Sequence, residues 1–174
     1  MKRVLLSFAV VTLGVSVLTA QVKKSTVEGI TNLAQVETTV ACAGAITPTS
    51  VAGIKRMGFA AIINLRQASE KGADLEAEAE AAKAAGIRFI SLPFDGSKPD
   101  PAVADQFLNT IQETGNQPAF IHCASGSRAA TMWFLKRVLI DKWDTDKALD
   151  EATQLGMASP ALKAFALRYI EAHK

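Results

Sequence analysis

The sequence predicts an α/β protein, namely a three-layer α/β/α sandwich around a mainly parallel central sheet of four to five strands. Three observations predict this class. Short apolar runs alternate with helical segments along most of the chain. The segments between these runs are long enough for the crossovers that parallel strands need. The 174 residues, 49% apolar and 21% charged, suit one globular domain, which we place at residues 36–174.

The first twenty residues are expected to be a signal peptide. Lys2 and Arg3 precede an uncharged run from Val4 to Leu18, and polar residues follow Ala20. The run is short for a bilayer span, which needs roughly 20 apolar residues. We therefore expect an exported protein, periplasmic or secreted, without stable membrane association after cleavage. An uncleaved N-terminal anchor is the alternative, and residues 21–35 are expected to be a polar lead-in.

Four segments are predicted to be strands because they are apolar, short and rich in β-branched residues. They are residues 36–43, 60–65, 88–94 and 118–122. In a parallel sheet the ligand lies beyond the carboxyl ends of the strands. Functional residues are therefore expected directly after Leu65, Leu92 and His122.

Helices are predicted between and after these strands. A capping side chain precedes a Pro at three helix starts: Thr47-Pro48, Asp100-Pro101 and Ser159-Pro160. Residues 74–85 are rich in Ala and Glu, and we interpret the acids among them as a solvated face: Glu76, Glu78 and Glu80. Glycines stand where helices are expected to end: Gly58, Gly86, Gly115 and Gly156. The part from Arg128 onward is expected to be wholly helical.

The charge balance excludes some classes of function. After residue 20 the basic and acidic residues are equal in number, and no basic stripe stands out, so we expect no nucleic-acid partner. Two His and two Cys without clustering argue against a zinc site, although a carboxylate-only metal site stays open. We expect no cofactor. The sequence leaves the oligomeric state open.

Residues 118–135 contain the most informative pattern. A strand ends at His122, a loop of small residues follows at 123–127, and Arg128 opens a helix that is apolar nearly all round. Backbone N–H groups of such a loop can bind an anion, aided by the helix N-terminus. The Arg128 guanidinium suits two oxygens of a phosphate. These groups would also stabilise a thiolate on Cys123, placed as a nucleophile.

Each of these residues also has an ordinary structural interpretation. A Cys at a strand end is commonly a small buried apolar residue, and Ser125-Gly126-Ser127 is a common turn sequence. The combination of Cys, a glycine-containing small loop and Arg at a strand-to-helix junction is more specific than any one of these features, and it favours a functional site.

The segment His122-Cys123-Ala124-Ser125-Gly126-Ser127-Arg128 resembles the signature loop of cysteine-dependent phosphatases, which include the protein tyrosine and dual-specificity phosphatases. Together with Gly58-Phe59, Ile62-Ile63-Asn64-Leu65-Arg66, Ala85-Gly86-Ile87 and Leu92-Pro93, it resembles more closely a bacterial group of phosphatase-like domains. Some of these domains are fused to metallo-β-lactamase-like hydrolases. The resemblance covers roughly residues 36–157.

The resemblance implies hydrolysis of phosphate monoesters through a phosphocysteine on Cys123, with a phosphorylated protein or a small phosphate ester as substrate. Arg128 is then catalytic, and the phosphate-binding residues are Ala124, Ser125, Gly126, Ser127 and Arg128. The family's general acid is an Asp some thirty residues before the Cys. Asp95 is our candidate, although Asp95-Gly96 is also a turn pair; Asp100 is the other candidate, with a simpler role as a helix cap.

Two neighbouring residues receive weaker assignments. Strand alternation points His122 away from Cys123, so we interpret it as a residue that supports the loop or as a plain core histidine. Arg66 follows a strand at the same sheet edge and is either a substrate contact or a solvated surface residue.

The loop departs from the broad phosphatase pattern in two ways. Four residues separate Cys123 from Arg128 where five are usual, and Ala129 stands where a hydroxyl residue is usual. The bacterial group commonly has the shorter loop. Rhodanese-type sulfurtransferases share this spacing, so a Cys123 persulfide carrier is the alternative function, and a non-enzymatic anion-binding module is the third. Cys42, near the end of the first predicted strand, is hypothesised to form a reversible disulfide with Cys123.

Overall fold

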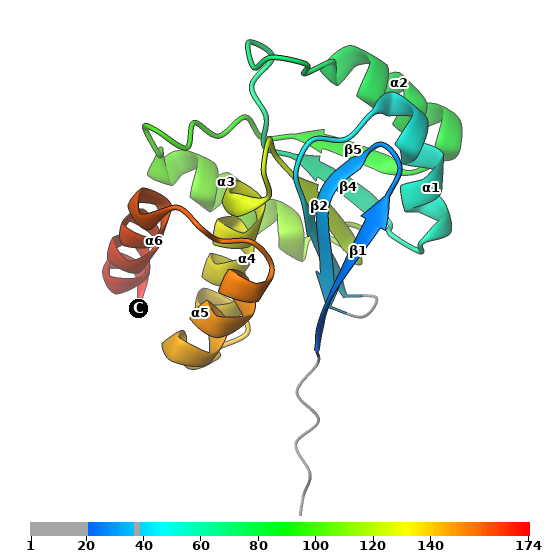
Figure 1. Ribbon diagram of the computed structural model, residues 1–174. Helices are drawn as coiled ribbons and strands as arrows, with labels where there is room; N and C mark the ends of the chain where they lie inside the picture. Colours follow the sequence, from blue (N-terminus) through cyan, green and yellow to red (C-terminus); the bar gives the residue numbers. More distant parts are fainter. Residues whose placement is uncertain (1–20, 37–38) are drawn as a thin grey trace, which may run out of the picture.

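The computed structural model describes residues 21–36 and 39–174, and its centre is a six-stranded sheet (Figure 1). The strands are β1 (Val22–Val27), β2 (Ile30–Val36), β3 (Val40–Ala43), β4 (Ala61–Asn64), β5 (Arg88–Ser91) and β6 (Ala119–His122). Their order in the sheet is β1-β2-β3-β6-β4-β5. The pairs β3–β6, β6–β4 and β4–β5 are parallel, whereas β1–β2 and β2–β3 are antiparallel. The expected signal peptide lies outside the described residues.

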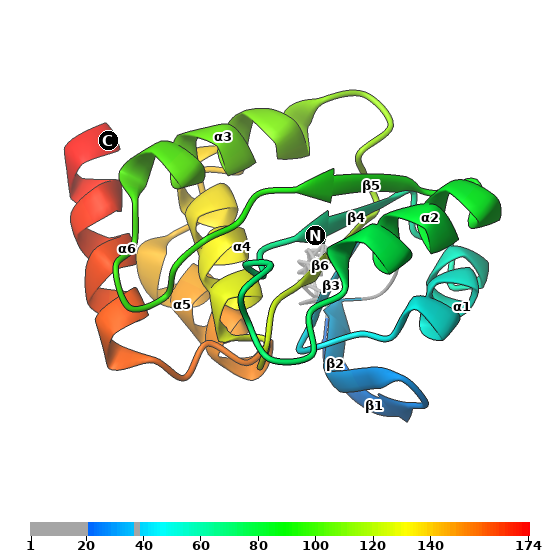
Figure 2. The ribbon, with the colours of Figure 1, turned by 90° about the horizontal axis from the view of Figure 1, so that it is seen from above.

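Helices cover both faces of the sheet, as the view in Figure 2 shows, so the expected three layers are confirmed. The helices are α1 (Val51–Arg56), α2 (Leu75–Ala85), α3 (Pro101–Gln112), α4 (Ser127–Leu139), α5 (Thr145–Gln154) and α6 (Pro160–His173), with a short 3-10 turn at Pro48–Ser50. One face carries α1 and α2, and the other carries α3 to α6 (Figure 2). In the described part of the chain, no helix is long and apolar enough to cross a bilayer.

The two faces of the sheet bury two separate cores. Along β4, Ile62 packs into the core under α1 and α2, and Ile63 packs into the core under α3 to α6. Phe120 and Ile121 divide in the same way along β6. Parallel strands covered on both faces are apolar throughout, which is why the sequence shows continuous apolar runs there.

Residues 21–35 are not the polar lead-in that we expected, because most of them form the β1–β2 hairpin. The alternation is interrupted in both strands: Lys23 and Lys24 are adjacent and both exposed, and Leu33 and Ala34 are adjacent and both buried. β1 is an outer strand, and outer strands carry more polar residues than central ones. The hairpin adds the strands that take the sheet from the four or five expected to six.

The expected helix starts are confirmed at two of three positions. Asp100 Oδ1 accepts a hydrogen bond from Ala102 N at 2.9 Å, and Ser159 Oγ accepts one from Leu162 N at 3.3 Å. Thr47 is the exception, because its side chain makes no cap bond and lies 2.9 Å from the Thr49 hydroxyl instead. A 3-10 turn begins there, so the expected capping geometry does not form. Gly86 ends α2 in the left-handed conformation, as predicted.

Candidate active site

The loop between β6 and α4 encloses the sulfur of Cys123. Cys123 N donates to Ala43 O at 3.1 Å, which extends the pairing with β3 by one residue. The chain then turns, and Gly126 N donates to Cys123 Sγ at 3.1 Å. Gly126 has a φ of 102°, a conformation that L side chains rarely adopt, and it is the N-cap of α4. The predicted loop of backbone donors at a helix N-terminus is therefore present, with the sulfur beside it.

Gly44 allows this loop to lie close to β3. Ala45 N donates to Ala124 O at 3.1 Å, and a Cβ at position 44 would come within 2.9 Å of the same oxygen. A side chain there would push the catalytic loop away. This glycine has no signal of its own in the sequence, since its role depends on a segment 80 positions further along the chain.

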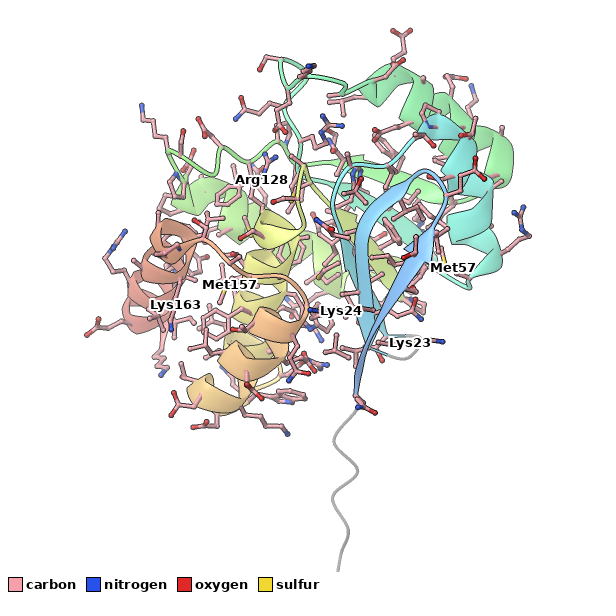
Figure 3. All side chains as sticks on the ribbon, in the orientation of Figure 1. Lys23, Lys24, Met57, Arg128, Met157 and Lys163 are labelled. Atoms are coloured by element: carbon pink, nitrogen blue, oxygen red, sulfur yellow. The ribbon has the colours of Figure 1, made fainter. Side chains whose placement is uncertain are left out.

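Arg128 stands at the start of α4 and is held by an ion pair that the sequence did not reveal (Figure 3). Its Nη1 donates to Glu70 Oε1 and its Nη2 to Glu70 Oε2, both at 2.7 Å. Nη1 also donates to Leu65 O at 2.9 Å and to Phe94 O at 2.8 Å. Two segments therefore fix the guanidinium, the β4–α2 loop and the β5–α3 loop, both at the carboxyl edge of the sheet.

The hydrogen bonds of Arg128 to Glu70, Leu65 and Phe94 leave two N–H groups of its guanidinium, and Arg128 also interacts with Cys123. A guanidinium has five N–H groups. Within the described residues, the protein acceptors above use both hydrogens of Nη1 and one of Nη2. The Nε hydrogen and the second Nη2 hydrogen lie on one side of the group, and they match two oxygens of a phosphate.

Charge interactions at Arg128 agree with this arrangement. Burial lowers the pKa of Arg128, but the hydrogen bonds to Glu70 and the neighbouring Cys123 outweigh it, so the net pKa is raised. Burial likewise raises the pKa of Glu70, and the Arg128 hydrogen bond outweighs it, so the net pKa is lowered. Glu70 therefore stays ionised and Arg128 stays charged beside Cys123.

Arg66 holds the segment that carries Glu70. Its side chain is 3% exposed; Nη2 donates to Lys71 O at 2.8 Å and Nη1 to Gly72 O at 3.0 Å. Its Nε lies 3.5 Å from Glu70 Oε2. Arg66 is therefore not a solvated surface residue, and its role as a substrate contact stays a prediction. Its hydrogen bonds to Lys71 O and Gly72 O hold the 66–72 loop in place.

Asp95 lies on the β5–α3 loop between two residues that touch Arg128. Phe94 O accepts from Arg128, and a Cβ at position 96 would lie 3.4 Å from Arg128 Cδ. The Asp95 carboxylate is exposed and accepts from Ser97 Oγ at 2.7 Å and Ser97 N at 2.8 Å. These bonds from Ser97 lower the pKa of Asp95. Asp95 is thus next to the site, and it also makes the turn that an Asp-Gly pair suggests.

His122 points to the face opposite Cys123, as predicted, and meets a buried carboxylate there. Its Nε2 lies 3.4 Å from Glu78 Oε2, and both side chains are at most 1% exposed. The interpretation of Glu78 as part of a solvated face is therefore wrong. Glu78 lies one helical turn before the buried Ala82, so it faces the sheet, while Glu76 and Glu80 face solvent.

The two serines of the loop connect it to its surroundings. Ser125 O accepts from Asn32 Nδ2 at 3.1 Å, which ties the loop to the β1–β2 hairpin. Ser127 Oγ accepts from Ala158 N and Ser159 N, both at 3.2 Å, which ties it to the turn before α6. The Ser127 hydroxyl therefore holds the turn, and the backbone of both residues belongs to the loop between β6 and α4.

Cys42 lies in the same core as Cys123 and on the neighbouring strand. It pairs with Ile121, two residues before Cys123, and both thiols are free and buried. Burial, with Cys123 and Glu151 nearby, raises the pKa of Cys42 well above its ordinary value of 9.0. Both thiols lie in one core, and the disulfide stays a prediction.

A metal site has no support among the described residues, since no three His, Cys, Asp or Glu side chains gather there in a way that would hold an ion. The site instead offers a buried sulfur, a loop of backbone donors and a fixed guanidinium. This set of groups defines the class of cysteine-based phosphatase-like proteins.

Sequence comparison leads to the same class. The family model of the phosphatase-like domain of beta-lactamase hydrolase-like proteins matches residues 32–140, and the chain belongs to this family. The family membership favours the phosphatase-like reading over the rhodanese alternative. A comparison with curated proteins gives no match.

Solved structures share the fold at low sequence identity. A DUF442 protein of Shewanella putrefaciens CN-32 has a TM-score of 0.70 at 20% identity over 84% of this chain and 95% of its own. P. aeruginosa TpbA has a TM-score of 0.66 at 20% identity over 91% and 94%. The catalytic core of S. cerevisiae Siw14, a PP-IP phosphatase, has a TM-score of 0.64 at 18% identity over 79% and 84%. The phosphatase-like fold predicted from the sequence is therefore confirmed.

Proposed function

We propose that this protein hydrolyses phosphate monoesters through a covalent phosphocysteine on Cys123. The observation that carries the proposal is the arrangement of three groups: the Cys123 sulfur 3.1 Å from Gly126 N, and Arg128 beside it, fixed by Glu70 through two bonds of 2.7 Å. A nucleophile and a positioned cation at an anion-binding loop are what phosphoryl transfer to sulfur requires.

The reaction has two steps. In the first, the Cys123 thiolate attacks phosphorus, so an S–P bond forms and the bond from phosphorus to the leaving oxygen breaks. The leaving oxygen takes a proton from an acid. In the second, water attacks phosphorus, the S–P bond breaks, and inorganic phosphate and the Cys123 thiolate are released. The N–H groups of residues 124–128 and the Arg128 side chain bind the phosphoryl oxygens in both steps.

Asp95 is the proposed acid and base. It would protonate the leaving oxygen in the first step and accept a proton from the attacking water in the second. Its place in the β5–α3 loop, directly after the carbonyl that binds Arg128, supports this role. Because its pKa is lowered, the protonated form is scarce at neutral pH, and turnover should favour mildly acidic conditions.

The proposed substrates are phosphorylated proteins or small phosphate esters. P. aeruginosa TpbA has been solved in complex with phosphotyrosine, and Siw14 is a PP-IP phosphatase. Both neighbours therefore bind or act on phosphorylated compounds. We also propose that the protein acts outside the cytoplasm after export, on the strength of the basic and apolar pattern of residues 1–20.

The test is turnover of a small aryl phosphate by the purified, reduced protein and by its Cys123→Ser variant. We expect clear release of phosphate by the wild type and none above background by Cys123→Ser. Cys42→Ala is the matched control, because it removes the other buried thiol, and it should keep its turnover. Absence of wild-type turnover, together with thiocyanate formation from thiosulfate and cyanide, would instead establish sulfur transfer.

A further inference from the structure

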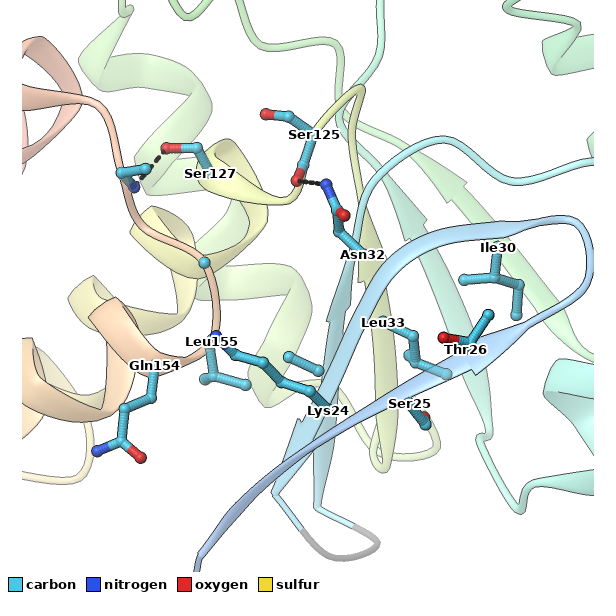
Figure 4. A pocket seen from close by; sticks show the side chains of 13 residues that line it. Lys24, Ser25, Thr26, Ile30, Asn32, Leu33, Ser125, Ser127, Gln154 and Leu155 are labelled. Carbon is cyan, nitrogen blue, oxygen red and sulfur yellow. Dashed lines mark hydrogen bonds between the residues drawn. The ribbon is translucent and has the colours of Figure 1, made fainter.

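A groove with a volume of about 740 Å³ lies beside the catalytic loop (Figure 4). One wall is the β1–β2 hairpin, and the other is the end of α5 with the turn that follows it. Ser125 and Ser127 of the catalytic loop line the groove where the two walls come together. A cavity of this size is comparable to the sites that hold ligands much larger than a phosphate group.

Both walls are attached to the loop that holds the phosphate. The hairpin wall is attached through Asn32, whose amide donates to Ser125 O at 3.1 Å. The turn wall is attached through Ala158 N, which donates to Ser127 Oγ at 3.2 Å. Gly126, between these two serines, donates to Cys123 Sγ. Because Ser125 and Ser127 line the groove, a substrate bound by its phosphoryl group at this loop has the groove beside it.

The lining of the groove suits a polypeptide. The lining combines apolar residues, among them Ala34 and Leu155, with residues that carry hydroxyl and amide side chains. Lys24 is the one charged side chain among the described residues that line it. An extended peptide offers apolar surface, polar backbone and a few charges. A ring carrying several phosphates lacks the apolar surface and would need more than one cation.

Lys24 lies at a defined distance from the loop. It pairs with Ala34, which is two residues along β2 from Asn32. At a rise of about 3.4 Å per residue, this is about 7 Å, or two residues of an extended peptide. Figure 3 shows Lys24 pointing from β1 toward the α5 side, whereas the adjacent Lys23 points the opposite way. Lys24 is therefore placed to meet a charge about two residues from the phosphate.

We propose that this groove binds the polypeptide on one side of a phosphorylated residue, and that Lys24 selects an Asp or Glu about two positions away. This inference rests on the proposed function, since it assumes that the phosphoryl group occupies the loop at Cys123. The groove then distinguishes protein substrates by the sequence around the phosphate. Small esters that do not reach it should be insensitive to Lys24.

The experiment compares three phosphotyrosine peptides: one with Glu two residues before the phosphotyrosine, one with Glu two residues after it, and one with Ala at both positions. The wild type should hydrolyse one of the Glu peptides with a kcat/KM about fivefold above that of the Ala peptide. Lys24→Glu should remove this preference. Lys23→Glu, the matched control on the opposite face of β1, should keep it. A small aryl phosphate should react equally with all three proteins.

The outcomes separate the two proposals. If the aryl phosphate is hydrolysed and kcat/KM is equal for all three peptides, the proposal for the groove is wrong and the proposed phosphatase activity still holds. If no phosphate ester reacts, binding of the same peptides to Cys123→Ser by fluorescence anisotropy decides: a Glu preference that Lys24→Glu removes supports the groove, and its absence overturns it. The protein could also hydrolyse an inositol polyphosphate faster than any peptide, with Lys24→Glu slowing that reaction. In that case the groove binds inositol polyphosphates, and the proposal that it binds a polypeptide is wrong.

Discussion

Glu70 and Arg128, 58 residues apart in the chain, share two hydrogen bonds of 2.7 Å that fix the guanidinium beside Cys123. Glu70 is itself held, because its carboxylate accepts from Gln67 N at 2.9 Å and lies beside the buried Arg66. The Arg128 guanidinium is thus positioned before any substrate arrives. A group held in its productive geometry costs less to order in the transition state.

Removing Glu70 should weaken phosphate binding by the site. In Glu70→Ala we expect kcat/KM for an aryl phosphate to fall by about 100-fold, because Arg128 loses its fixed orientation. Inhibition by inorganic phosphate should weaken in parallel, which a loss of general stability alone would not produce. Glu76→Ala, on the exposed side of α2, is the control and should behave as the wild type. Equal behaviour of the two variants would show that Arg128 does not need Glu70.

The same ion pair should make stability depend on pH. The pKa of Glu70 is lowered from 4.5, so its carboxylate contributes stability that is present above pH 4.5 and is lost as the pH falls through the lowered pKa. Wild type should therefore be more stable than Glu70→Gln at pH 7, and the difference should shrink below pH 4.5. Urea unfolding at both pH values measures it. A difference that stays constant with pH would contradict the assignment.

The loss of activity on replacing Asp95 should depend on the leaving group of the substrate. A poor leaving group, such as an alkoxide, needs a proton, whereas an acidic phenol leaves without one. We expect Asp95→Asn to lower kcat by about 100-fold for an alkyl phosphate and by far less for an activated aryl phosphate.

The matched control for Asp95 is Asp100→Asn, since Asp100 caps α3 and was the other candidate acid. This variant should affect both esters equally and weakly. If Asp95→Asn slows both esters to the same extent, Asp95 orders the turn with Ser97 and is not the acid.

The buried pair of His122 and Glu78 should contribute to stability. Removing the Glu78 carboxylate leaves the buried His122 imidazole without its polar neighbour, so Glu78→Ala should lower the free energy of unfolding by about 2 kcal/mol. Glu80→Ala, on the exposed face of the same helix, should change it by less than about 0.5 kcal/mol. Chemical denaturation of both variants makes the comparison, and similar values for the two would contradict a structural role for Glu78.

The parts predicted well from the sequence are those that depend on local signals. The apolar runs of β4 and β6 and the Asp-Pro and Ser-Pro helix starts at 100–101 and 159–160 are read from a few adjacent residues. The Cys123 loop is also local, because nucleophile, glycine and Arg128 lie within six positions. The central layers and the loop from Cys123 to Arg128 could therefore be placed without coordinates.

The parts that were missed depend on distant neighbours. Glu70 follows β4 in a loop without a motif, and only the fold brings it to Arg128. The β1–β2 hairpin is weakly patterned because an outer strand needs little apolar surface. Glu78 was misplaced although a signal existed: it lies four residues before Ala82, on the face of α2 that the apolar positions define.

The most direct test of the central claim is a search for phosphate on Cys123. The protein is mixed with an aryl phosphate, quenched in acid within the turnover time, digested and analysed by mass spectrometry. The account predicts a phosphoryl group on the peptide that contains Cys123, more abundant in Asp95→Asn if that variant slows hydrolysis of the intermediate. Turnover without any phosphoryl group on Cys123, or with one on another residue, would contradict it.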